Sequence, residues 1–184
     1  DAEMSNRASL PRHPAVVGFG NQGGTVVDVE YELVDLRAFA SNLRLYINND
    51  ASLPTLRQMR GDVLHIALDV RVEREGKPFI VLTEGKDYAA QHYVGLGELF
   101  SISPFHTVVV SNVNNGSSSS CLPRIFNMIG ASDVVMNMYL PTRRAKKMFN
   151  ELFYTKLLAG SPASRAYREA LLEMAKTKEY SPAH

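Results

Sequence analysis

A glycine-rich stretch near the start of the chain has a spacing that could bind a nucleotide. Residues Gly18 to Gly23 match the pattern G-x-G-x-x-G and begin at the end of the apolar segment Ala15–Phe19. The pattern binds dinucleotides when a helix begins inside it, because the helix N-terminus then meets the pyrophosphate. The segment Thr25–Asp28 intervenes here, and its β-branched residues begin helices poorly. We therefore predict that Gly18–Gly24 is a flexible loop, with a nucleotide-binding α/β domain as the alternative.

A histidine and the single cysteine are the candidates for acid–base or nucleophilic catalysis. His65 lies inside the apolar segment 62–68, where a histidine is more often a hydrogen-bonded core residue than a general base. Cys121 follows a run of serines and opens a predicted helix, and a helix N-terminus favours the reactive thiolate. A buried, unreactive thiol is the alternative. The chain has no spacing typical of a metal or glycosidase site, and we expect no metal and no cofactor.

Charge is distributed unevenly along the chain. The net charge is +1, which argues against strong nucleic-acid binding. Residues 1–120 hold 10 basic and 14 acidic side chains, a balance of −4, whereas residues 121–184 hold 10 and 5, a balance of +5. The densest basic cluster consists of Arg143, Arg144, Lys146 and Lys147. It is either a solvated helix start or a docking face for an acidic partner.

Length and composition predict one globular domain. A chain of 184 residues, 45% of them hydrophobic and 21% charged, is typical of a single domain with its own core. One cysteine excludes an intrachain disulfide and fits a reducing compartment, so we expect a cytoplasmic protein. No stretch approaches the roughly 20 apolar residues that span a bilayer, and the polar N-terminus is not a signal peptide. We expect a flexible tail at 1–13, one domain at 14–178 and a tail at 179–184, together forming the C-terminal part of a larger protein.

The order of predicted elements indicates an α/β fold. Short segments that are apolar on both faces alternate with amphipathic segments, a pattern typical of a parallel sheet covered by helices. Strands are expected at 15–19, 43–47, 62–68, 79–82, 106–111 and 133–138. Helices are expected at 29–40, 53–59, 96–100, 122–129 and 142–158, with a last one after Pro162 whose inward side chains include Tyr167 and Leu171. Sites in such folds lie at the carboxyl ends of strands, here in the loops after Phe19, Leu68 and Ser111.

Two strand ends and the segments after them carry a recurring set of motifs. The first end reads His65-Ile66-Ala67-Leu68-Asp69, and the second reads Ser111-Asn112-Val113-Asn114-Asn115-Gly116. Leu-Pro-Arg-Ile-Phe at 122–126, Gly-Ala at 130–131 and Leu-Leu-Ala-Gly at 157–160 follow in order. Over about residues 14–175 the chain resembles the CHAT domain, a caspase-like family of clan CD cysteine peptidases. The resemblance implies a three-layer α/β/α sandwich with a mostly parallel, caspase-like sheet.

The resemblance also identifies the two positions at which the family's catalysis takes place. In the family the first strand ends in His-x-Ala-Thr-His-Gly and the second in Ser-Ala-Cys-x-Thr-Gly. The second histidine and the cysteine form the catalytic dyad. The matching residues here are Asp69 and Val113, and His65 matches only the first, structural histidine. Valine has no nucleophilic atom and aspartate is a poor base for a thiol, so the resemblance implies a degenerate domain without enzyme activity.

We expect such a pseudoprotease to act as a protein-binding or scaffolding module. An emptied pocket could hold an extended segment of a partner without cutting it. Its expected lining is His65, Asp69, Ser111, Asn112, Val113 and Asn114. Because the family is often carried behind TPR repeats, the partner is expected to be a protein or peptide, and repeat regions of the same full-length chain are one candidate.

Three alternatives stay open at this point. An active cysteine protease would use Cys121 as its nucleophile, with His65, His92 or His106 as the base. A nucleotide-binding domain would use Gly18–Gly24. A domain that only packs against its neighbours would have no functional pocket.

Overall fold

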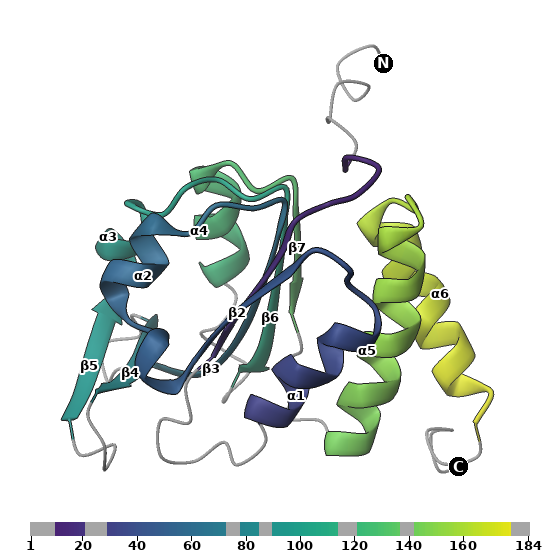
Figure 1. Ribbon diagram of the computed structural model, residues 1–184, viewed down its shortest axis with the longest axis horizontal. Coiled ribbons are helices and arrows are strands. Elements are labelled where there is room, and N and C mark those ends of the chain that lie inside the picture. The colour runs from purple at the N-terminus through teal and green to yellow at the C-terminus, as the bar shows by residue number, and fades with distance from the viewer. Residues whose placement is uncertain are drawn as a thin grey trace.

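The strands of this chain form one sheet built around a single long strand, β3. The computed structural model describes residues 10–20, 29–72, 78–84, 90–113, 121–136 and 142–177 (Figure 1). The sheet has seven strands: β1 (Val16–Gly20), β2 (Leu43–Ile47), β3 (Val63–Val72), β4 (Pro78–Glu84), β5 (Ala90–Gly95), β6 (Thr107–Val113) and β7 (Asp133–Met136). The first half of β3 pairs in parallel with β1 and β6, and its last residues pair in antiparallel with β4.

Five of the strands are parallel neighbours in the order β2-β1-β3-β6-β7. Strands β4 and β5 add an antiparallel hairpin beside the distal half of β3. The sheet is therefore mostly parallel, as the sequence predicted. Because parallel strands end at the same edge, the carboxyl ends of β1, β3 and β6 lie together.

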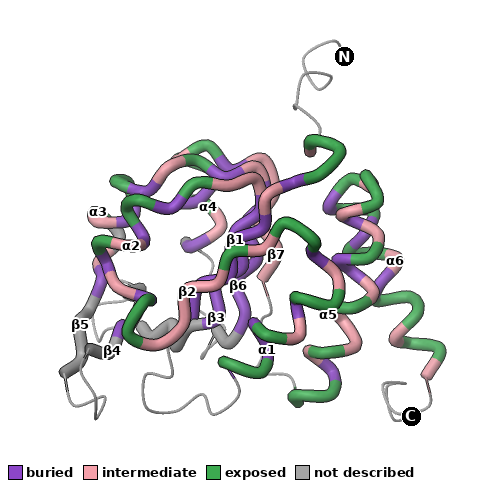
Figure 2. The backbone as a smooth tube through the Cα atoms, viewed as in Figure 1, coloured by how far each residue is buried: buried purple, intermediate pink, exposed green. Residues whose placement is uncertain are grey.

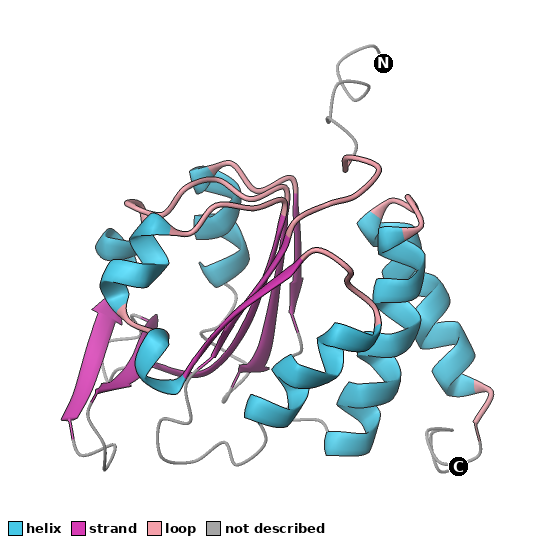
Figure 3. Cartoon of the chain, viewed as in Figure 1, coloured by secondary structure: helices cyan, strands magenta, loops and turns pink. Residues whose placement is uncertain are grey.

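Helices cover both faces of the sheet (Figures 1 and 3). The helical segments are α1 (Val29–Asp35), η2 (Leu36–Ala38), η3 (Asn48–Asp50), α2 (Leu53–Gln58), α3 (Leu96–Leu99), α4 (Cys121–Ile129), α5 (Arg143–Leu158) and α6 (Ala163–Ala175). Helices α2, α3 and α4 pack on one face, and α1, α5 and α6 pack on the other. The three-layer α/β/α sandwich expected from the sequence is thus the observed architecture.

The central strands are largely buried (Figure 2), and their alternate residues supply two separate cores. Leu64 and Ile66 of β3 pack with α2, α3 and α4, whereas Val63 and Ala67 pack with α1, α5 and α6. Successive strand residues point to opposite faces, so a strand with helices on both sides must be apolar at nearly every position. This requirement explains why β3 and β6 were recognisable as continuous apolar runs.

Local sequence signals determine where several helices begin and end. The Oγ of Ser52 accepts a hydrogen bond from the Thr55 amide at 3.3 Å, and Oγ1 of Thr142 accepts one from the Ala145 amide at 3.2 Å. Both side chains are N-caps, which satisfy a backbone amide at the start of each helix. Gly130 and Gly160 follow α4 and α5 with φ of 114° and 95°, a left-handed conformation that glycine adopts without a steric penalty.

Three expectations about the elements were wrong. The helix expected at 29–40 ends at Asp35, and its last turn tightens into the 3-10 segment η2. Strand β5 was not predicted, because it is defined by its pairing with β4 rather than by an apolar pattern of its own. Tyr167 and Leu171 were expected to face inward but are 38% and 43% exposed, because α6 buries a stripe of small residues instead: Ala163, Ala166 and Ala170.

Among the described residues, no helix has both the length and the apolar character that a membrane crossing requires.

Candidate functional site

The two positions assigned from the sequence to the family's dyad lie side by side near the carboxyl ends of adjacent strands. Asp69 lies in β3 and Val113 is the last residue of β6. The register shifts after Ala67, which pairs with Ser111, and Val70 then lies opposite Val113. Asp69 directly precedes Val70, so Asp69 and Val113 lie close together on neighbouring strands. Ser111 is buried, whereas the side chains of Asp69, Asn112 and Val113 and the whole of Asn114 lie outside the described part of the chain.

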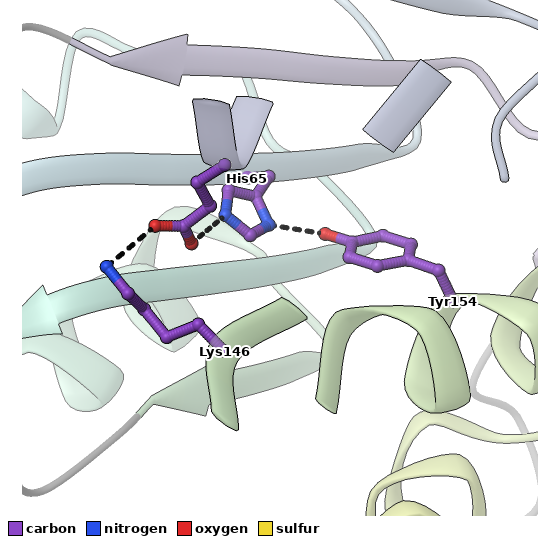
Figure 4. Close-up of polar contacts among 4 residues, drawn as sticks. His65, Lys146 and Tyr154 are labelled. Carbon is purple, nitrogen blue, oxygen red and sulfur yellow. Dashed lines mark hydrogen bonds and ion pairs between the residues drawn. The ribbon is translucent and has the colours of Figure 1, made fainter. Parts of the chain in front are cut away.

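His65, four residues before Asp69 on β3, is the centre of a buried polar network (Figure 4). Its Nε2 lies 2.9 Å from Oε1 of Glu32, and its Nδ1 lies 2.7 Å from the hydroxyl of Tyr154. An ionised carboxylate can only accept, so Nε2 donates to Glu32, and in the neutral ring Nδ1 accepts from Tyr154. His65 is completely buried with both nitrogens occupied. It is the hydrogen-bonded core histidine that the sequence favoured, and it contributes no surface to an open pocket.

Glu32 links this histidine to two further elements. Its Oε2 lies 3.3 Å from Nζ of Lys146 on α5, and it also bonds to the Ser111 side chain on β6. Glu32 is itself on α1, and Tyr154 is on α5. The network therefore ties α1 and α5 to β3 and β6, the two strands that carry the dyad positions.

The surroundings of Glu32 keep it ionised despite its burial. Burial raises its pKa, but the hydrogen bond and electrostatic interaction with His65, the charge of Lys146 and the Ser111 hydrogen bond outweigh that effect. Together they lower the pKa of Glu32 to about 2. Burial, followed by the charge of Glu32, raises the pKa of Tyr154 well above its usual value of 10.0, so its hydroxyl keeps its proton.

We expect the free energy of unfolding to decrease as the pH falls from about 4.5 to about 2. A carboxyl whose pKa is lower in the folded state stabilises the fold above its unfolded pKa, and this contribution disappears as the pH falls through the folded value. Glu32→Gln should be less stable than the wild type at neutral pH but should lose less stability on acidification. Urea unfolding at a series of pH values measures both effects.

The surface carboxylate of Glu169 titrates in the same pH range, so its effect on stability must be separated from that of Glu32. Hydrogen bonds from Arg165 and Lys156 lower the pKa of Glu169 to about 2. The side chains of Glu169, Arg165 and Lys156 are partly exposed, so the contribution of their ion pairs to stability should be screened at high salt. At high salt, Glu169→Gln should follow the wild-type pH profile. If the free energy of unfolding of Glu32→Gln depends on pH as steeply as that of the wild type, the role given to Glu32 is contradicted.

Three residues of the basic cluster contact α1 of the same chain. The Arg143 guanidinium lies 4.2 Å from the centre of the Tyr31 ring, Lys146 pairs with Glu32, and Nζ of Lys147 lies 3.6 Å from Oδ2 of Asp35. The acidic helix α1 of the same chain is therefore one partner of this basic cluster, and a docking face for another protein stays a prediction. Most of this basic cluster contributes to the packing of α1 against α5.

Gly18 and Gly20 belong to β1 and have a packing role. The loop expected over Gly18–Gly24 is therefore wrong for its first three residues, and residues 21–28 lie outside the described ranges. A Cβ at Gly20 would lie 2.5 Å from Cγ1 of Val29 and 2.9 Å from the Ala67 carbonyl oxygen. A Cβ at Gly18 would lie 2.6 Å from Leu45. Close contact between α1, β1 and β2 accounts for both glycines without a nucleotide.

Gly20→Ala should lower the free energy of unfolding by about 1–3 kcal/mol, because the added methyl group overpacks the contact with α1. Gly97→Ala is a matched control: its Cβ would meet nothing within 4 Å, and it lies in the helix α3. Alanine there should be neutral or stabilising by up to about 1 kcal/mol. Urea unfolding of both variants is the measurement, and equal stabilities would contradict the packing role.

Cys121 begins α4, on the opposite face of the sheet from the His65 network. Leu122 and Phe126 of this helix pack in the core that contains Leu64, whereas Tyr154, the partner of His65, packs in the other core. The backbone of His106 accepts hydrogen bonds from the amides of Ser132 and Asp133, which follow the end of α4. Helix α4 has nine residues and is about 13 Å long, so His106 lies at its far end.

The described residues therefore bring neither His65 nor His106 to Cys121. The third suggested base, His92, lies in β5, and its side chain is outside the described part, as is that of Cys121. No group of three or more histidine, cysteine, aspartate or glutamate side chains that could hold a metal ion occurs within the described ranges.

Sequence reasoning missed Glu32 and Tyr154 and placed Lys146 only in the basic cluster, although one signal for the network was present. Glu32 lies between Val29 and Leu33 on the inward stripe of α1. A carboxylate on an apolar stripe requires buried donors, because its desolvation is otherwise too costly. That argument predicts buried partners for Glu32, but it does not say which residues supply them.

Comparison with known proteins agrees with this arrangement. The family model described as CHAT domain matches residues 6–184 of the 184-residue chain. No curated protein matches the chain. The family match covers the whole sheet and the helices on either side, including Asp69 and Val113. On this match, the chain belongs to the CHAT domain family, a caspase-like family.

Proposed function

We propose that this chain is a catalytically inactive CHAT domain, a pseudoprotease that binds a protein or peptide partner. The observation that carries the proposal is the pair of residues at the dyad positions. Asp69 and Val113 occupy neighbouring positions on parallel strands, where a base and a nucleophile would have to meet. A valine side chain cannot attack a carbonyl, and a carboxylate is poorly matched to deprotonate a thiol.

The environment of Cys121 supports the same proposal. A cysteine nucleophile needs a base within hydrogen-bond reach, about 2.6–3.2 Å. His65 packs on the other face of the sheet with both nitrogens hydrogen-bonded, and His106 lies beyond the far end of α4. Neither is in a position to activate a thiol at the start of α4.

The partner that we propose is an extended protein segment. Active members of a peptidase family hold their substrates as extended chains, and a site that has lost its dyad keeps the surface for this without the chemistry. A repeat region of a longer chain that contains this domain is one candidate. The polar residues Asp69 and Asn112, near the strand ends, are the side chains that we expect to contact it.

Restoring the dyad tests the assignment of its positions. In a Cys121→Ser background, Asp69→His with Val113→Cys should create a thiol that reacts with iodoacetamide at neutral pH. We expect this reaction to be at least about tenfold faster than for Val113→Cys alone, because an adjacent histidine favours the thiolate. Equal rates in the two variants would contradict the assignment of the dyad to these strand ends.

Partner binding is tested separately. Titration of the domain with extended peptides taken from candidate repeat regions, followed by fluorescence anisotropy, should find at least one that binds. We expect Asp69→Ala with Asn112→Ala to weaken that complex at least about tenfold, the effect of losing two hydrogen bonds. Asp50→Ala, on the exposed segment η3, is the control and should leave affinity unchanged. Unchanged affinity in the double variant would contradict binding at the strand ends.

A further inference from the structure

A cavity of about 180 Å³ lies between the sheet and the helices α5 and α6. Its lining is mostly apolar and includes Val109, Val135, Met136, Phe149, Leu171 and Met174. Glu32, Ser111, Lys146 and Asn150 also line it. An apolar cavity of about 150 Å³ is large enough to bind benzene, so this one has room for a single large apolar side chain.

Asn150 is the unusual residue of this cavity. The residue is only 5% exposed, and within the described residues its side-chain amide makes no hydrogen bond to the protein. Because Asn150 lines the cavity, this amide is open to a bound molecule, which could supply the partner that buried polar groups nearly always have. Asn150 also lines a hollow of about 10 Å³ beside Arg143 and Lys147, which has room for at most about one water molecule. The larger cavity is the one that could hold a ligand.

The polar lining suits an uncharged group. Glu32 and Lys146 form an ion pair, and Glu32 also bonds to Ser111 and His65, so these charges are already neutralised within the domain. The Asn150 amide offers one acceptor oxygen and two donor hydrogens. A peptide group, with one donor and one acceptor, is complementary to it.

The cavity adjoins the edge of the sheet. Among the described residues β7 pairs only with β6, which leaves its other edge available to a further strand. A second hollow is lined by all four residues of β7 and by Ala163, Ser164 and Tyr167 of α6. It shares Val135, Met136 and Tyr167 with the cavity. A chain that lies along β7 therefore passes the cavity.

We propose that this cavity binds one apolar side chain of an extended peptide lying along β7, with Asn150 bonding to a peptide group. An added strand presents alternate side chains to the face of the sheet that carries Val109 and Val135, the face that the cavity occupies. Main-chain pairing supplies affinity, and the cavity selects leucine or phenylalanine. The site is separate from the dyad positions and does not depend on whether the domain cleaves peptides.

Methionine-methyl NMR tests this site directly. The probes are acetyl-Thr-Leu-Thr-amide, acetyl-Thr-Ala-Thr-amide and toluene. The leucine peptide should shift the methyl signals of Met136 and Met174, which line the cavity, in a saturable way. Met128 is 64% exposed on α4 and should not shift. The alanine peptide should bind at least about fivefold more weakly, because it leaves the cavity unfilled.

Three variants separate the contributions of the amide and the cavity. Asn150→Leu should weaken the leucine peptide at least about fivefold and leave toluene unaffected, because only the peptide uses the amide. Ala145→Leu should fill the cavity and abolish both. If Ala145→Leu does not fold, Leu171→Gln at the 43% exposed rim should still weaken the leucine peptide.

The outcomes are distinguishable. Toluene binding without peptide binding, no binding of any probe, or equal shifts at Met128 would each overturn the inference. Peptide binding that is unaffected by both Asn150→Leu and Ala145→Leu would overturn it as well. Binding at the cavity accompanied by cleavage of the peptide would support the inference and contradict the proposed function.

Discussion

Replacing Glu32 with alanine is expected to lower the free energy of unfolding by about 3–5 kcal/mol. The substitution removes the acceptor of the fully buried Nε2 of His65 and the ion-pair partner of Lys146, whose side chain is 10% exposed. Removing one partner from a buried charged network is costly in this range. Equilibrium urea unfolding at neutral pH measures the loss.

A second carboxylate on the same helix provides the control. Asp35 pairs with Lys147 at 3.6 Å, and their side chains are 34% and 59% exposed. Exposed pairs contribute less than about 1 kcal/mol, so Asp35→Ala should be close to the wild type. Similar losses for the two variants would mean that α1 is stabilised by its general charge and not by the buried network.

Substitutions of Tyr154 should separate its hydrogen bond from its packing. Tyr154 is completely buried and contacts Phe153 and His65. Tyr154→Phe keeps the ring but leaves Nδ1 of His65 without a partner, which should cost about 1–3 kcal/mol. Tyr154→Ala also creates a cavity and should cost at least about 3–5 kcal/mol. Both values come from urea unfolding.

Tyr31→Phe is the matched control for the hydroxyl. Tyr31 is 56% exposed on α1, so loss of its hydroxyl should change stability by less than about 0.5 kcal/mol. If Tyr154→Phe is as stable as the wild type, the hydrogen bond to His65 does not contribute to the fold. The network would then need to be redefined without Tyr154.

The sequence predicted those elements whose pattern is determined by burial. Strands β3 and β6 lie between two helical layers, so they are apolar on both faces and could be recognised without any knowledge of their neighbours. Strand β5 contains Gln91 and His92 and exists through its pairing with β4, so its own residues gave no comparable signal.

The buried network around His65 was also predictable only in part, because burial along the strand is visible in the sequence and contacts between distant elements are not. His65 could be assigned to the core because its neighbours along the strand are apolar. Its partners, however, are 33 and 89 residues away in the sequence, and the packing of α1 and α5 on the sheet brings them together. Asn150 could not be identified as unpaired from sequence, because its lack of a partner depends on every element around it.

The two positions assigned to the dyad, in contrast to the partners of His65, could be paired from the sequence. Asp69 and Val113 were assigned from a resemblance in motifs, with no information about their spacing. The register of β3 and β6 makes these two positions neighbours, whereas their assignment to the dyad stays a proposal. Motif order was sufficient to predict that the two strand ends are adjacent, because parallel strands bring their carboxyl ends to one edge.

Peptide hydrolysis is the measurement that tests the proposed lack of catalysis most directly. The wild type, Cys121→Ser and the restored-dyad variant would be incubated with internally quenched peptides that place each of the twenty amino acids at the cleaved bond. We predict no cleavage by the wild type above the level of Cys121→Ser. Wild-type cleavage that disappears in Cys121→Ser would contradict the proposal and identify Cys121 as the nucleophile of an active protease.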